Sequence, residues 1–206
     1  MSVKTMGMLW VGLALFLNNG FAATPSPDQM VSEMGQRALK SFNRDYEKIR
    51  GDRAHLIRII EEEIKPHCDF SRMTRLAVGR PWRDATPEQK ATLEAEFTEL
   101  LVSTYSASYE LFRNASFQVK PVRMNPGDDD ISVLTTVTLR DAPQMGMLYR
   151  LYLKDGSWKI YDVAVDGISL VATYRTTFAD LYVKGGLENI IAQLKEKNQA
   201  NLKKNR

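Results

Sequence analysis

Apolar residues recur at helical spacing through the first half of the chain beyond residue 27. Stripes in which apolar positions lie three or four residues apart are typical of amphipathic helices. They predict helices over 28–50, 52–65 and 70–78, and a longer helix over 86–112. The longer helix has a well-marked start, because its first four residues read Thr-Pro-Glu-Gln, the pattern of a capping box with proline in the first turn.

The helical period gives way to simple alternation after residue 114, which is typical of strands with one buried face. Short turn sequences separate the alternating segments, and Asp155-Gly156 is a strong signal for a tight hairpin. Helical spacing returns near Ser169. The expected fold is therefore α+β, with helices packed on one face of a curled four-stranded antiparallel sheet. Its parts are a helical region at about 28–113, the sheet at about 115–166 with strands at 117–119, 133–139, 147–153 and 158–165, and C-terminal helices at about 168–198.

The first residues have the pattern of a secretory signal peptide. Lys4 precedes an apolar run over 6–17, and small residues lead up to Ala22. A membrane anchor is the alternative, but the run is shorter than the roughly 20 apolar residues that a span needs. We therefore expect cleavage of residues 1–22, which leaves 23–206 as a single exported domain.

Composition and charge narrow the function classes. The formal net charge of +3 gives no reason to expect nucleic-acid binding, and the single cysteine, Cys68, excludes an internal disulfide. The two histidines, His55 and His67, belong to no cluster with metal-ligand spacing, and no nucleotide-binding or nucleophile motif is present. Asp162 is a possible general base in a sheet-lined cavity, but alternation directs it away from the apolar face. We expect no catalytic residue, no cofactor and no metal.

Strand alternation and helix stripes bring a set of apolar and aromatic side chains to common faces. Periodicity does not distinguish a filled core from a lined cavity, and the filled core is the simpler interpretation. If the faces enclose a pocket, its candidate residues are Met73, Leu76, Phe97, Leu100, Leu101, Tyr105, Val133, Val137, Met147, Tyr149, Leu151, Tyr161, Val163, Val165, Val171, Tyr174 and Phe178.

Several separate motifs, in order along nearly the whole of 23–206, resemble one known family. They are Asp69-Phe70, Gly79-Arg80, Trp82-Arg83 and the run 85–89, then the run 158–163, Gly167-Ile168-Ser169-Leu170, Tyr174-Arg175 and Gly185-Gly186. On these residues the chain resembles the MlaC family, also called the toluene-tolerance family. His67-Cys68 departs from what many members carry, and we expect that change to be neutral.

The resemblance implies a periplasmic phospholipid-binding protein of Gram-negative bacteria. Such a protein is the soluble link between an inner-membrane ABC transporter complex, which has a substrate-trapping ring subunit, and an outer-membrane lipoprotein complex. The system maintains outer-membrane lipid asymmetry. Acyl chains of a diacyl phospholipid are expected between sheet and helices, with the head group near solvent beside Tyr105 and Arg175. The alternatives are a periplasmic adaptor or chaperone with a filled core and, less favoured, an enzyme.

Overall fold

The structure is a computed structural model that describes residues 25–106, 109–140 and 143–204. The expected signal peptide, 1–22, lies outside the described residues. Within them, no helix combines the length and the hydropathy needed to cross a membrane.

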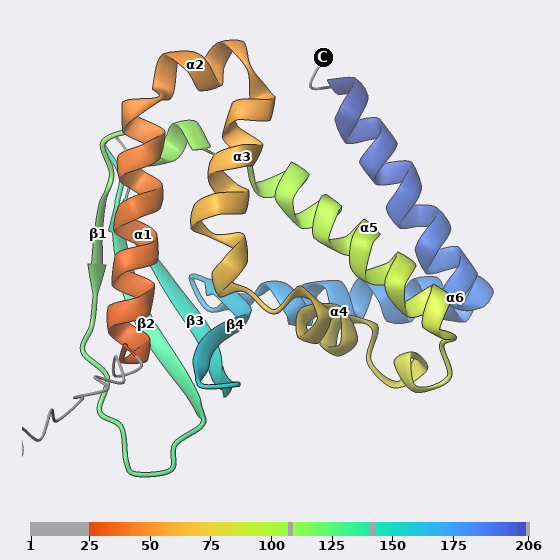
Figure 1. Cartoon of the computed structure of the whole chain (residues 1–206). Coiled ribbons are helices and arrows are strands. Elements are labelled where there is room, and N and C mark those ends of the chain that lie inside the picture. The colour runs from red at the N-terminus through yellow and green to blue at the C-terminus, as the bar shows by residue number, and fades with distance from the viewer. Residues whose placement is uncertain (1–24, 107–108, 141–142, 205–206) are drawn as a thin grey trace, which may run out of the picture.

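The N-terminal helices pack in a short up-and-down arrangement (Figure 1). A capping box between Ser26 and Gln29 starts the first helix at Pro27, one residue before its expected start. The helix expected over 28–50 breaks at Asp45, whose backbone leaves the helical region. The bounds are α1 Pro27–Arg44, α2 Tyr46–Gly51, α3 Arg53–Glu63 and the 3₁₀ turn η1 Lys65–His67.

The next helices follow their sequence signals closely. Gly79, with φ of 71°, ends the first of them at the expected residue. The capping box is confirmed, since Thr86 N donates to Gln89 Oε1 at 3.0 Å and Gln89 N to Thr86 Oγ1 at 3.2 Å. The long helix stops earlier than 112, and a separate 3₁₀ turn follows. The bounds are α4 Phe70–Val78, η2 Arg80–Arg83, α5 Pro87–Ser106 and η3 Tyr109–Phe112.

The sheet is an antiparallel meander in which five strands lie in sequence order. The hairpin at Asp155 and Gly156 has positive φ at both residues, 50° and 76°, as a tight type I′ turn requires. One strand more is present than the alternation predicted, because a two-residue strand pairs with the preceding one before the last helix begins. The strands are β1 Ser116–Val119, β2 Asp130–Thr138, β3 Met145–Lys154, β4 Ser157–Val165 and β5 Ile168–Ser169.

The last helix, α6 Leu170–Lys204, is broken at Gly185 and Gly186, where the backbone leaves the helical region. Its two halves run in different directions, and the second half returns alongside α5 (Figure 1). Asn198 Nδ2 donates to the backbone oxygen of Glu96 at 2.9 Å and ties this half to α5. The glycine pair therefore ends one helix and starts another.

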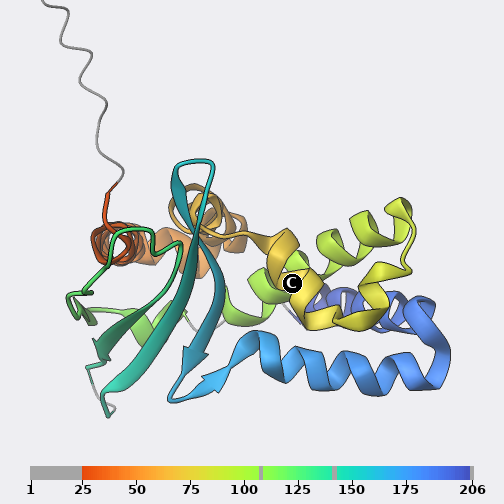
Figure 2. The same ribbon diagram turned by 90° about the horizontal axis from the view of Figure 1, so that it is seen from below.

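One large apolar core lies between the curled sheet and the helices, and Figure 2 shows the sheet at one end with the helical arm of α4, α5 and α6 extending from it. The core joins side chains from α1, α4, α5, β2, β3, β4 and α6. A smaller cluster joins α1, α2 and α3. Together these features confirm the α+β fold of helices packed on a curled antiparallel sheet.

Gly35 marks the closest approach of α1 to the sheet. A Cβ at this position would lie 2.5 Å from Cε1 of Phe117 on β1. We expect Gly35→Val to lower the free energy of unfolding by about 1–3 kcal/mol, because the helix must move off the sheet or the ring must leave its rotamer. Chemical denaturation measures the change. Gly51→Val is the control, since nothing lies within 4 Å of a Cβ there, and equal losses in both variants would contradict the role of this contact.

Candidate functional site

A groove of about 900 Å³ opens between the β3–β4 hairpin and helices α4 and α5. Its volume is at the upper end of the range of roughly 300–1,000 Å³ that is usual for ligand cavities. Small and apolar residues alternate with charged ones along its walls. The lining residues are Lys65, Cys68, Asp69, Phe70, Ser71, Ala91, Glu94, Ala95, Thr98, Glu99, Lys154, Asp155, Ser157 and Lys159.

The groove lies directly against the main core. Cys68 and Phe70 line the groove and also pack against the core cluster. Burial raises the pKa of the Cys68 thiol to about 12, so this side chain is an apolar wall and not a reactive thiolate. These two side chains therefore form a wall that the groove and the core share.

A polar cluster joins α4 to the sheet at one end of the groove. Asp69 caps α4 by accepting from Arg72 N at 2.8 Å, and it also accepts from Lys154 Nζ at 2.9 Å and from the hydroxyl of Tyr152. Burial raises the pKa of Asp69, but these hydrogen bonds outweigh burial and leave it below its ordinary value of 3.8. Asp69 is therefore ionised and fixes the start of α4 against β3.

Arg72 completes this cluster from the first turn of α4. Its guanidinium lies 3.8 Å from the ring centroid of Tyr152 and 4.2 Å from that of Tyr161, and Nη2 lies 3.2 Å from Asp130. The Tyr161 hydroxyl donates to Asp130 at 2.8 Å. These contacts hold the seam between α4 and the sheet closed at this end.

The Asp69 contacts give a dependence of stability on pH. Because the pKa of Asp69 is lowered in the folded state, its contribution is fully present above about pH 4 and is lost as the pH falls through the folded value. We expect Asp69→Asn to lower the free energy of unfolding by about 1–3 kcal/mol at pH 7. The difference from the unaltered protein should shrink as denaturation is measured at lower pH. Asp84→Asn, at an exposed carboxylate, is the control, and a difference that stayed constant down to pH 2 would contradict this assignment.

Most of the predicted pocket residues lie in the core and not in the open groove. None of the seventeen is among the groove-lining residues. Leu76, Met147, Val163 and Tyr174 pack against the core while partly exposed, Val165 is half-buried, and Tyr105 is 51% exposed. Ten are buried: Met73, Phe97, Leu100, Leu101, Val133, Val137, Tyr149, Leu151, Val171 and Phe178.

The expectation that Tyr161 shares a face with Val163 is wrong. The register between β3 and β4 shifts between Arg150 and Leu151, so that Tyr161 is an extra residue in β4. Val163 pairs with Tyr149 and faces the core, whereas Tyr161 contacts the ring of Tyr152 at 5.9 Å between centroids. On the N-terminal side of the bulge, the side chains of β4 that face the core are Trp158 and Ile160.

The possible general base, Asp162, has a structural role. It is buried at the start of α6, where it accepts from Val171 N at 3.0 Å and from Ser169 Oγ at 2.6 Å. A carboxylate with its oxygens occupied in this way has no free face for a substrate. Among the described residues, no three His, Cys, Asp or Glu side chains gather where they could hold a metal ion.

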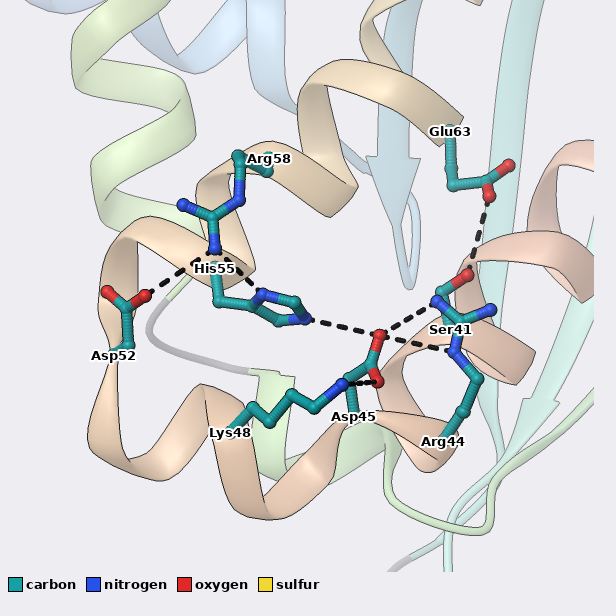
Figure 3. A network of polar contacts seen from close by, with 8 residues as sticks. All are labelled: Ser41, Arg44, Asp45, Lys48, Asp52, His55, Arg58 and Glu63. Atoms are coloured by element: carbon teal, nitrogen blue, oxygen red, sulfur yellow. Dashed lines mark hydrogen bonds and ion pairs between the residues drawn. The ribbon is translucent and has the colours of Figure 1, made fainter.

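A histidine–carboxylate pair lies at the other end of the helical region (Figure 3). His55 Nε2 is 3.2 Å from Asp45, which also binds Arg44 at 2.7 Å and Lys48 at 3.2 Å. The hydrogen bonds from Arg44 and His55 hold the pKa of Asp45 well below its ordinary value. His55 Nδ1 faces Arg58 at 2.8 Å. The network therefore joins α1, α2 and α3 around the buried Asp45.

A second cavity, of about 630 Å³, lies where α4, η2 and the first half of α6 meet. Four arginines converge on it, and we call it the arginine pocket. Arg175, the predicted head-group residue, is one of the four, but sequence reasoning missed the other three. The signal that could have found them is the density of arginine in the segment 72–83. The lining residues are Arg75, Leu76, Gly79, Arg80, Trp82, Arg83 and Arg175.

Comparisons with known proteins agree with one another. A family model described as MlaC protein matches residues 32–196. The intermembrane phospholipid transport system binding protein MlaC of Haemophilus influenzae is 18% identical over 196 residues, which is 91% of this chain and 92% of that protein. The toluene tolerance protein ttg2D of Pseudomonas putida is 30% identical over 104 residues, 50% of this chain and 48% of its own length.

A solved structure shares the fold. It is the phospholipid-binding protein of Ralstonia solanacearum in complex with a phospholipid, which superimposes with a TM-score of 0.78 at 30% sequence identity. The match covers 84% of this chain and 97% of that chain.

Proposed function

The chain belongs to the MlaC family, and from this premise we propose that it binds phospholipid and carries it between membranes. The observation that supports this most directly is the groove of about 900 Å³ beside an apolar core that lies between sheet and helices. The solved relative in complex with a phospholipid has the same fold.

Acyl chains need such a carrier because of their hydrophobic surface. Two chains with about 30 methylenes cost roughly 24 kcal/mol to expose to water, at about 0.8 kcal/mol per methylene. An isolated phospholipid therefore hardly leaves a bilayer. A carrier need only offer surroundings about as apolar as the membrane, after which the donor and acceptor complexes determine the direction of net transfer.

We infer that the acyl chains enter the groove between the β3–β4 hairpin and α5 and extend into the core. The predicted pocket residues would line the chains once sheet and helices separate. Met30, Met34 and Met73 lie in this core, and unbranched thioether side chains repack easily around chains of different shape. The filled core and the lined pocket are then the closed and open forms of one apolar interior.

The head group would stay at the mouth of the groove. Its cations are Lys65, Lys154 and Lys159, and its acids are Asp69, Glu94, Glu99 and Asp155. A rim with both signs of charge suits a zwitterionic head group, with the phosphate near the lysines. Tyr105 and Arg175 line no part of the groove, so the three lysines replace them in this proposal.

The transport role follows from family membership together with the signal pattern. We propose that residues 1–22 are removed on export and that residues 23–206 act in the periplasm as one domain. The partners would be the inner-membrane ABC transporter complex, with its substrate-trapping ring, and the outer-membrane lipoprotein complex. Lipid carriage between them would maintain outer-membrane lipid asymmetry. No step in this role requires catalysis.

A periplasmic adaptor with a filled core is the second candidate, and the burial of ten of the predicted pocket residues favours it. Native mass spectrometry of the exported protein, followed by organic extraction and lipid analysis, separates the two. We expect a stoichiometric phospholipid that denaturation releases. A lipid-free mass, together with no uptake of labelled phospholipid from vesicles, would leave the adaptor.

A further inference from the structure

The arginine pocket carries an unusual concentration of unpaired positive charge. Arg75 comes from α4, Arg80 and Arg83 from η2, and Arg175 from α6. Within the described part of the chain, none of these four guanidinium groups makes a hydrogen bond or an ion pair. All four residues are exposed, and no carboxylate lines the cavity.

Elsewhere on the surface, arginines meet carboxylates. Arg37 pairs with Glu63 at 3.2 Å, and Arg44 pairs with Asp45 at 2.7 Å. Four like charges around one cavity repel one another, and among the described residues no carboxylate lines the cavity to offset this repulsion. Such a field attracts an anionic partner and increases its rate of association.

The number of charges indicates the kind of anion. A phosphodiester of a phospholipid carries one negative charge, whereas four arginines surround this cavity. Lys90 is a further cation nearby, since its Nζ lies 5.9 Å from the ring centroid of the half-buried Trp82. Several carboxylates match this arrangement better than one phosphate does. Tryptophan and arginine are also the residues most enriched at the energetic centres of protein interfaces.

We propose that the arginine pocket docks an acidic segment of a partner protein, in which several carboxylates surround an apolar side chain that packs on Trp82. This goes beyond the proposed lipid binding, because the pocket shares no lining residue with the groove. Because the two sites share no lining residue, a partner could dock here while lipid occupies the groove. Both sites use α4, through Phe70 in the groove and Arg75 in the pocket.

The test uses a short synthetic peptide of glutamates around a central leucine. The indole N–H signal of Trp82 reports binding by NMR, and the buried Trp158 serves as an internal reference. We expect a saturable shift at Trp82 that weakens as salt is added. The double variant Arg80→Glu/Arg83→Glu should weaken binding by roughly tenfold or more, whereas Arg123→Glu, at an exposed site outside the pocket, should not.

Other outcomes would overturn the proposal. They are the absence of a shift at Trp82, an equal shift with a peptide that carries glutamine for glutamate, or binding unaffected by both the double variant and Arg175→Gln. A shift with a soluble short-chain phosphatidylglycerol but none with the acidic peptide would assign the pocket to a lipid head group. Lipid content is measured on the same preparations. Protein that carries lipid but ignores the peptide refutes docking alone, and protein that binds the peptide without ever carrying lipid refutes only the proposed function.

Discussion

Tryptophan in place of Ala95 is expected to reduce the phospholipid that co-purifies with the protein by about tenfold or more. Ala95 is exposed on the side of α5 that lines the groove. An indole there would fill the space between α5 and the β3–β4 hairpin that we propose for the acyl chains. A loss of only about 1.4 kcal/mol in lipid affinity corresponds to tenfold. Native mass spectrometry with quantitative lipid extraction measures the effect.

The control for this substitution is Ala192→Trp, at an exposed position of α6 outside both cavities. Both variants should keep the stability of the unaltered protein to within about 0.5 kcal/mol, since the substituted positions are on the surface. If the Ala95 variant carried its full complement of lipid, the chains would have to enter elsewhere, and the groove would lose its proposed role.

Phe97→Ala is expected to produce the largest loss of stability, about 3–5 kcal/mol in the free energy of unfolding. Phe97 is fully buried, and its ring centroid lies 4.8 Å from that of Tyr174 and 5.2 Å from that of Phe178. Removing the ring leaves a cavity in the seam between α5 and α6, which rigid helices close only partly. Denaturant titration of the lipid-free protein gives the value.

Leu111→Ala serves as the control for this loss, because Leu111 is 57% exposed on η3. It should change the free energy of unfolding by no more than about 0.5 kcal/mol. A loss below about 1 kcal/mol for Phe97→Ala would mean that α5 and α6 are loosely packed even without lipid. That result would count against the proposal that the lipid-free protein has a closed, well-packed core that opens to form the pocket.

The fold could be predicted from the sequence wherever local signals act alone. The bounds of α4 follow from its apolar stripe and from Gly79, and the start of α5 from its capping box. The bulge at Tyr161 could not be predicted, because it depends on how β4 pairs with β3. It changes which side chains of β4 before the bulge face the core, so that Trp158 and Ile160 are core residues and Tyr161 is not, whereas Val163 keeps its expected face. The short strand β5 could not be predicted either, because two residues are too few to show the alternation that marks a strand.

The candidate site was harder to predict than the core. Apolar stripes mark what is buried in the closed protein, and they identified ten buried residues correctly as facing inward. The groove is lined by the opposite kind of position, a second stripe of small and polar residues on α5 that includes Ala91, Ala95 and Thr98. That stripe looks like an ordinary solvated helix face. The arginine pocket joins Arg75 to Arg175, which are brought together only by the packing of α6 on α4.

The order of strands in the meander also affects how readily the sheets of two molecules can associate edge to edge in a concentrated solution. Its two edges are its shortest strands, β1 with four residues and β5 with two. Each covers only part of its neighbour, four residues of β2 and two of β4, and short edge strands are one of the ways in which proteins limit edge-to-edge pairing. The protein should therefore remain monodisperse at high concentration, with little tendency to associate edge to edge into larger sheets. This property would suit the proposed carriage of lipid between two membranes.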